Sequence, residues 1–305
     1  MESFLVFLSA VFAAPFFSGV ILKVKAFFGG KKGPSVFIPY YTLIKLFQKA
    51  SVYSKSTTYI FKLSPMISLT IGLLTLLFFP FAGRASVLSF NGDIIAIVYF
   101  MALGRFFTIL AALDTASPFE GMGAAREAYF SIIAEATLFM ILLLFYLMNR
   151  ELNLSSYLMQ EKSIFLWKTA GSSLLFIIVS LFMLLLAENS RVPVDDPSTH
   201  LELTMIHEVM ILDHSGPDLA LIELGASLKL LFYASFIARL IFPFDCGYTL
   251  FNVFFFFMAV GVVYVAIGIT ESMTARFKMT SVPIFIMMSF ALAFFATVFN
   301  WELIK

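Results

Sequence analysis

The stretch AENSRVPVDDPSTHLELTMIHEVMILDHS, residues 187–215, lies between two long apolar runs of an otherwise hydrophobic chain. It contains six of the 19 acidic residues, all three histidines and a single base, Arg191. So many ionisable groups beside a membrane are unfavourable unless they contact water, a protein partner or a proton path. We call residues 188–217 the acidic segment. We expect the apolar runs to form the scaffold that holds this segment in place.

The composition is that of a membrane protein, because 61% of the 305 residues are hydrophobic and the mean hydropathy is +0.96. This predicts an all-α, polytopic membrane protein in which residues 1–305 form one bundle. The net charge of +1 and the lack of a basic stripe argue against nucleic-acid binding. The single cysteine, Cys246, excludes an intrachain disulfide and an iron–sulfur cluster held by this chain alone.

Eight apolar runs are each long enough to cross a bilayer, which takes about 20 mostly apolar residues. The first run lacks the basic region and the small-residue cleavage site of a signal peptide, so we expect a retained span. The predicted transmembrane helices are residues 3–23, 61–82, 93–112, 125–148, 167–187, 218–242, 247–269 and 282–300.

The connection between the first two spans, residues 24–60, is basic. From Lys23 to Lys62 the chain has eight lysines and no acidic residue. The positive-inside rule places this loop in the cytoplasm, although a few bases in the loop after residue 149 weakly oppose it. With eight spans, both termini then lie on the outer side of the cytoplasmic (inner) membrane, and the acidic segment faces the cytoplasm.

Residues 39–50 of the basic loop have the pattern of an amphipathic helix in the membrane interface. Leu43, Leu46 and Phe47 share one face, and Lys45 and Lys49 lie on another. Such a helix is either a support that rests on the membrane or one wall of a surface that docks a partner.

Ionisable residues also occur inside the predicted spans, where they usually face the bundle interior or water. They form either buried pairs that fix helix packing or a path for ions or protons, and their number favours the path. Counted from the inner ends of their spans, Arg105 and Glu223 lie roughly 8–10 Å deep, whereas Glu135 and Lys229 lie roughly 15–17 Å deep. We therefore predict that Glu135 and Lys229 pair, directly or through water.

The histidines do not form a metal site. His200, His207 and His214 recur every seven residues, so on one helix successive members would be roughly 10 Å apart, too far to share an ion. His207-Glu208 begins like the zinc-protease pattern HExxH, but Ile211 stands where the second histidine belongs. Hydrogen bonding at an interface, or titration near neutral pH, fits these side chains better.

Three stretches resemble one known family: residues 187–230, the basic-loop sequence GPSVFIPYYTLIKLFQK (33–49) and LGRFFTILAALDTASPFEGMGAARE (103–127). They are similar to the H-subunit family, whose members are membrane subunits of respiratory complex I. They are more similar to the corresponding subunit of energy-converting membrane-bound nickel–iron (NiFe) hydrogenases, including the formate hydrogenlyase type, than to the subunit of complex I. The resemblance covers nearly the whole chain.

The resemblance implies a non-redox subunit that anchors a soluble redox module and couples it to H⁺ or Na⁺ translocation. The NiFe centre and the iron–sulfur clusters would lie on partner subunits, and this chain would bind no cofactor or metal. The implied partners are soluble hydrogenase-like large and small subunits, an iron–sulfur subunit and antiporter-like membrane subunits.

The resemblance and the charge pattern together give two sets of candidate residues. The expected ion path consists of Arg105, Asp114, Glu135, Glu188, Glu202, Glu208, Asp213, Glu223 and Lys229. The expected docking surface for the soluble module consists of Lys31, Lys32, Glu120, Arg126, Glu127, Arg191, Asp195 and Asp196.

The chain departs from quinone-reducing members of the family at two places. The basic loop reads Gly33-Pro34-Ser35-Val36-Phe37, where those members typically have GPNRVG, and the acidic segment reads Pro193-Val194-Asp195, where they typically have Pro-Phe-Asp. These differences favour the hydrogenase-like branch. A quinone-type respiratory complex I member, the H-type subunit itself, is the first alternative. A stand-alone secondary transporter is the second, and it predicts inverted repeats that the sequence does not show.

Overall fold

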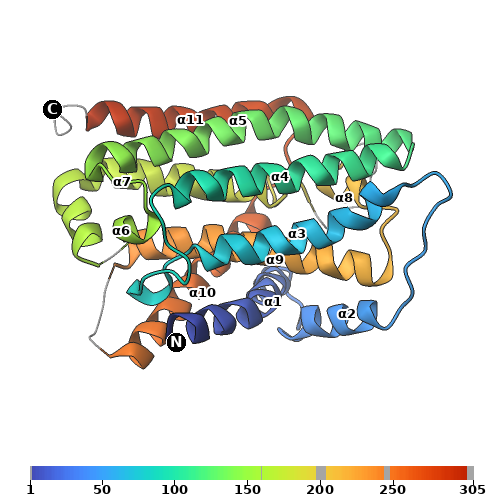
Figure 1. Cartoon of the computed structure of the whole chain (residues 1–305), viewed down its shortest axis with the longest axis horizontal. Helices are drawn as coiled ribbons and strands as arrows, with labels where there is room; N and C mark the ends of the chain where they lie inside the picture. Colours follow the sequence, from blue (N-terminus) through green and yellow to red (C-terminus); the bar gives the residue numbers. More distant parts are fainter. Residues whose placement is uncertain (1, 159, 197–203, 244–247, 301–305) are drawn as a thin grey trace.

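The computed structural model describes residues 2–158, 160–196, 204–243 and 248–300, and Figure 1 shows its helices running mostly along the long axis of the molecule. Its elements are α1 (Glu2–Phe28), α2 (Ile38–Phe47), α3 (Tyr59–Leu77), η1 (Phe81–Gly83), α4 (Asp93–Asp114), α5 (Pro118–Asn149), α6 (Leu154–Leu158), α7 (Gln160–Glu188), α8 (His207–Met210), α9 (Gly216–Ile241), α10 (Thr249–Met273), η2 (Met279–Ser281) and α11 (Val282–Phe299).

The predicted all-α membrane fold is confirmed. Within the described residues, eight helical stretches are long and apolar enough to cross a membrane, and each overlaps one predicted span. Several helices extend beyond the apolar run, because backbone hydrogen bonds continue past the hydrocarbon boundary. Helix α5 starts at Pro118, since proline suits the first helical turn, where the N–H has no helical partner.

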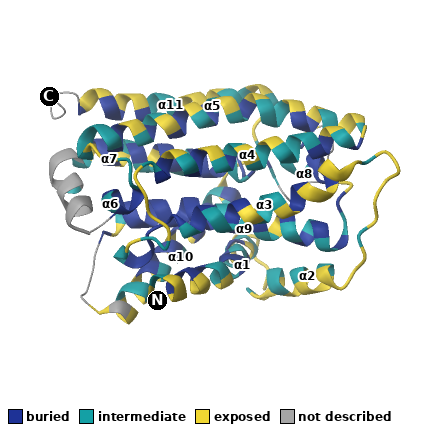
Figure 2. Ribbon diagram, in the orientation of Figure 1, coloured by how far each residue is buried: buried dark blue, intermediate teal, exposed yellow. Residues whose placement is uncertain are grey.

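Helix α9 is the centre of the bundle and contacts α1, α2, α3, α7 and α10. Figure 2 shows it as the most continuously buried of the helices. Small residues allow α3 to approach it closely: a side chain at Gly225 would lie 2.9 Å from Ser68 Oγ, and one at Gly72 would lie 3.1 Å from Leu228 Cβ. Close approach of small residues is a common way to pack helices in lipid, where the hydrophobic effect does not drive association.

The basic loop and the end of the acidic segment meet at one end of the bundle. The backbone N–H of Val52 donates to Ser215 Oγ at 3.0 Å. Gly216 has a positive φ of 57°, and a Cβ there would lie 2.7 Å from the Ala50 carbonyl oxygen, so both the turn and the contact require glycine. The expectation that the two segments share a side is therefore met.

The predicted amphipathic helix is present as α2, which packs against α1 and α9. Leu43 and Leu46 are partly covered, whereas Lys45 is exposed, as the pattern predicts. Phe47 is 48% exposed, and Tyr41 and Ile44 are also exposed, so α2 has a second apolar stripe that faces away from the rest of the chain.

Candidate functional site

Four charged side chains from four helices form a cluster inside the bundle. Arg105 of α4 binds Glu188, the last residue of α7, through Nη1, and Glu135 of α5 through Nη2. Lys229 of α9 lies with Nζ 2.8 Å from Glu188 Oε2 and donates to the Glu188 carbonyl oxygen at 2.7 Å. Two acids and two bases give the cluster no net charge, so each charge has an opposite partner in a low-dielectric region. We call these residues the ion-pair cluster.

Glu135 and Lys229 do not pair directly, because each of these residues has another partner, and their pairing through water stays a prediction. Glu135 pairs with Arg105, and Lys229 pairs with Glu188. The expectation considers the depth of each residue but not how the helices are arranged around one another. Glu188 is the final helical residue of α7, and its side chain, only 4% exposed, lies between the two bases Arg105 and Lys229. Glu223, whose depth matched that of Arg105, is an exposed residue of α9.

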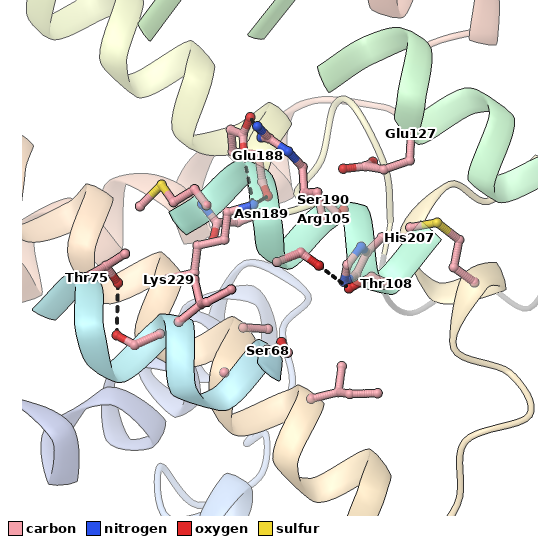
Figure 3. A pocket seen from close by; sticks show the side chains of 18 residues that line it. Ser68, Thr75, Arg105, Thr108, Glu127, Glu188, Asn189, Ser190, His207 and Lys229 are labelled. Atoms are coloured by element: carbon pink, nitrogen blue, oxygen red, sulfur yellow. Dashed lines mark hydrogen bonds and ion pairs between the residues drawn. The ribbon is translucent and has the colours of Figure 1, made fainter. Parts of the chain in front are cut away.

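A cavity of about 90 Å³ adjoins the ion-pair cluster. Figure 3 shows Arg105, Glu188 and Lys229 at one side of it and Glu127 and His207 at the other. A polar cavity needs about 10–15 Å³ for a water molecule and two to four polar partners, so this one accommodates several waters. It can therefore connect the ion-pair cluster to the acidic segment through water.

Three other candidates from the predicted path occupy the same end of the bundle. Glu208 is half-buried and interacts electrostatically with Glu223. The backbone N–H of Asp213 donates to Glu120 Oε1 at 3.1 Å, and Glu120 is fully buried at the start of α5. Asp114 accepts hydrogen bonds from Thr58 N at 2.6 Å and from its hydroxyl at 2.9 Å, so it holds the start of α3.

Asp195, expected on the docking surface, is buried in the acidic segment. Its carboxylate accepts hydrogen bonds from the backbone N–H groups of Ile206 at 2.9 Å and His207 at 3.1 Å, and it lies 2.7 Å from Arg276 Nη2. The Asp195 carboxylate therefore joins two parts of the acidic segment, at residue 195 and at residues 206–207, and attaches them to the loop after α10. Any contact of Asp195 with a partner stays a prediction.

Arg191, also expected on the docking surface, has an internal partner that the sequence reasoning missed. Glu271, near the end of α10, has a side chain with no exposed area and lies 3.3 Å from Arg191 Nη1 and 3.0 Å from Lys25 Nζ. The sequence contains a signal for such a partner, because Arg191 is the only base of the acidic segment and needs a carboxylate beside it if it is buried. This group ties the acidic segment to α1 and α10.

Glu120, also expected on the docking surface, is fully buried and holds the backbone of Asp213, so its contact with a partner stays a prediction. The other docking candidates are more accessible. Lys31 and Lys32 are exposed, and Asp196 is half-buried. Arg126 donates to the Met205 carbonyl oxygen at 2.8 Å, and Glu127 lines the cavity. Glu202 and His200 lie outside the described residues. Among the described residues, no group of three or more His, Cys, Asp or Glu side chains is arranged to hold a metal ion.

His214 lies at the junction between the acidic segment and α9. Its ring stacks on Phe61, with centroids 3.9 Å apart and an interplanar angle of 8°, and the residue is 5% exposed. Burial lowers the pKa of His214 from 6.5 to about 4, although the Asp218 carboxylate partly opposes the shift. The imidazole is therefore neutral at physiological pH and acts as an aromatic contact.

This pKa predicts a pH-dependent stability. The folded pKa lies below the unfolded value, so the unfolded state binds the proton more readily and the free energy of unfolding falls as the pH drops from about 6.5 towards 4. His214→Phe keeps a stacked ring that cannot titrate. Between pH 7.5 and 4.5, we expect the wild type to lose about 2 kcal/mol more than the variant, measured from thermal midpoints. Parallel losses in the two proteins would contradict this assignment.

The fold and the site define a class: polytopic helical membrane proteins with a buried network of ion pairs in the bundle. The sequence matches the NADH dehydrogenase family over residues 1–301, and the chain belongs to this family.

Two relatives match nearly end to end. The chain is 28% identical to hydrogenase-4 component C of Escherichia coli (strain K12), covering 93% of this chain and 90% of that protein. It is 26% identical to formate hydrogenlyase subunit 4 of the same strain, covering 93% of each. The H-type subunit of NADH-quinone oxidoreductase from Pelagibacter ubique is 26% identical over 67% of this chain and 61% of its own length.

A solved structure has the same fold. It is a chain of the membrane-bound sulfane sulfur reductase, an archaeal respiratory membrane complex, with a TM-score of 0.80 and 17% identity over 98% of each chain.

Proposed function

We propose that the chain is a non-redox membrane subunit of an energy-converting, hydrogenase-like complex, where it anchors a soluble redox module and couples it to H⁺ or Na⁺ translocation. One observation carries the proposal: the hydrogenase-4 and formate hydrogenlyase subunits match over 93% of the chain, whereas the NADH-quinone oxidoreductase protein matches over 67%. The cavity between the ion-pair cluster and the acidic segment supports a route for protons or ions.

In this proposal, the partners supply the redox chemistry. Soluble large and small hydrogenase-like subunits would carry the NiFe centre, an iron–sulfur subunit would deliver electrons, and antiporter-like membrane subunits would extend the ion path. The chain's own residues would hold charge in the bundle and respond to events in the soluble module through the acidic segment. The volume of about 90 Å³ supports water rather than a quinone headgroup, since small-molecule pockets typically measure about 300–1,000 Å³.

Purification of the tagged chain from its native membrane tests the proposal. We expect co-purified soluble subunits, with nickel and iron in the preparation and hydrogen evolution from a reduced low-potential donor. A complex that contains bound quinone and responds to quinone-site inhibitors would support the complex I alternative instead. A chain that purifies alone and transports ions when reconstituted would support a stand-alone transporter.

The docking proposal predicts an effect of charge reversal in the basic loop. Lys31 and Lys32 are exposed, and Lys31→Glu/Lys32→Glu leaves the buried ion pairs unchanged. We expect the double variant to release the soluble module at lower salt than the wild type, because attraction between exposed charges is screened by salt. Co-purification at increasing salt measures this, and identical release curves would remove the basic loop from the interface.

The proposed orientation, with both termini outside the cytoplasmic membrane, predicts opposite labelling of two loops. In a Cys246→Ser background, Ser35→Cys and Glu151→Cys place single thiols at exposed positions in the basic loop and in the loop after α5. An impermeant maleimide added to whole cells should label position 151 only, and position 35 only after the membrane is opened. Labelling of both from one side would overturn the topology.

A further inference from the structure

Glu127, which the sequence places on the docking surface, lines the cavity beside the ion-pair cluster. It belongs to α5, the helix that also carries Glu135, and it is half-buried. Figure 3 shows its side chain extending from the helix towards Arg105 and Ser190. The Glu127 carboxylate therefore faces the cavity, where it can exchange protons with water.

Glu127 borders two spaces that can hold water. The larger is the cavity of about 90 Å³, and the smaller, of about 10 Å³, has Glu127, Ser131 and Glu188 in its lining. A space of about 10–15 Å³ holds one water molecule if polar partners surround it. Glu127, Glu188 and Ser190 line both spaces, so water on either side of Glu127 can also contact Glu188.

The larger cavity is lined by polar atoms that require water. Among the described residues, Arg105 Nε and Asn189 Oδ1 are buried and have no hydrogen-bond partner in the protein. Both residues line the cavity. A buried donor or acceptor without a partner is unfavourable, and a water molecule that bonds to it removes the penalty. The cavity is therefore suited to a chain of water molecules between Glu127 and the ion-pair cluster.

Acids outnumber bases around the cavity. The titratable and charged groups in its lining are Arg105 of α4, Glu127 of α5, Glu188 of α7, His207 of α8 and Lys229 of α9. Glu135 adds a third carboxylate through its pair with Arg105. Counted with a neutral histidine, three carboxylates and two bases carry a net charge of −1, which one added proton neutralises. The set can therefore bind and release a single proton.

A proton suits this site better than Na⁺. Two bases, Arg105 and Lys229, form one side of the cavity and repel a metal cation. The Glu188 carboxylate lies between these bases, so its oxygens already have partners. A proton needs no set of ligands, because it moves between carboxylates and water along hydrogen bonds.

We propose that Glu127 is the residue through which protons pass between the acidic segment and the ion-pair cluster. This inference rests on the proposed coupling role and assigns Glu127 to the ion path instead of the docking surface. When Glu127 releases a proton to a cavity water, the water chain passes a proton to Glu135, and the negative charge moves from Glu135 to Glu127. Arg105 interacts electrostatically with both carboxylates, so it stabilises the charge in either position.

Three substitutions at Glu127 test the proposal in sealed vesicles of the intact complex. Glu127→Gln cannot carry a proton, so translocation should fall about ten-fold or more while electron transfer to an artificial acceptor is retained. Glu127→Asp keeps a carboxyl group and should retain most of the translocation. Glu127→His supplies another proton carrier, so translocation should exceed that of Glu127→Gln, with a pH profile altered by a group that ordinarily titrates near pH 6.5.

Rescue by histidine separates proton transfer from a structural role, since histidine resembles glutamate in neither shape nor charge. Glu151→Gln, at an exposed position just after α5, is the control and should translocate normally. Loss of translocation in all three Glu127 variants, or normal translocation in Glu127→Gln, would overturn the proposal.

Release of the soluble module at increasing salt separates the path from docking. Glu127→Gln should release it at the same salt concentration as the wild type, and release at lower salt would return Glu127 to the docking surface. If Glu135→Gln lowers translocation and Glu127→Gln does not, the proposed function stands and the assignment of Glu127 fails. If neither variant lowers it, both fail. Translocation that requires Na⁺ and resists a protonophore would also overturn the inference.

Discussion

Glu188→Gln is expected to be the most disruptive single substitution in the chain. It leaves Arg105 and Lys229 with one carboxylate between them, that of Glu135, so the cluster acquires a net charge of about +1. Breaking a buried ion pair by removing one partner typically costs about 3–5 kcal/mol. We therefore expect the thermal midpoint of the purified complex to fall by at least about 5 °C, with reduced assembly in the membrane.

Two further variants separate charge from shape. Glu2→Gln removes the carboxylate from an ion pair with Arg84 in which the glutamate is 64% exposed, and such surface pairs contribute about 0–1 kcal/mol. Its midpoint should stay close to that of the wild type. Glu188→Gln/Lys229→Met restores neutrality to the cluster, so we expect it to be more stable than Glu188→Gln alone. If the double variant is the weaker one, the cluster is not held by charge balance.

Glu135→Gln is expected to lower ion translocation without dissociating the complex. The Glu135 side chain is 33% exposed, and Arg105 retains Glu188 as a second carboxylate, so the structural cost is smaller than at Glu188. A carboxylate that exchanges protons with its surroundings is needed for a proton path, and glutamine cannot replace it. In sealed vesicles we expect translocation to fall about ten-fold or more, while electron transfer to an artificial acceptor is retained.

Electron transfer measured on the same vesicles is the internal control for Glu135→Gln. Lys229→Ala should have a similar effect on translocation or destabilise the bundle, because it removes one of the two bases that neutralise Glu188. Normal translocation by an intact Glu135→Gln complex would assign this carboxylate to helix packing alone.

The spans follow from the sequence because each apolar run exceeds the length that the bilayer requires. The ends of the helices do not follow from the sequence in this way, since backbone hydrogen bonding continues a helix into the polar residues beyond the apolar run. The predicted seventh span ends at residue 269, whereas α10 continues to Met273. This difference hides Glu271, the buried partner of Arg191 and Lys25, from a search for charges within spans.

The partners within the ion-pair cluster could not be predicted for a different reason. Counting residues gives the depth of Glu135 and Lys229 in the membrane, but it does not give the position of one helix around another. Several pairings are consistent with the same depths, and only tertiary packing places Glu188 between Arg105 and Lys229. The presence of charged groups in the bundle was thus predictable, whereas their partners were not.

The central position of α9 has a consequence for biogenesis. Its mean hydropathy of 1.6 is the lowest of the eight candidate spans, and it carries Glu223, Lys229 and Arg239. A charged residue at the centre of a helix costs about 2.5–3.5 kcal/mol during insertion by the translocon, so α9 is a poor substrate for entering lipid alone. Its main neighbour, α3, is synthesised earlier, and so is Glu188, whose negative charge complements Lys229. Because these partners are synthesised first, α9, the least hydrophobic of the eight candidate spans, can pack against them as soon as it leaves the ribosome.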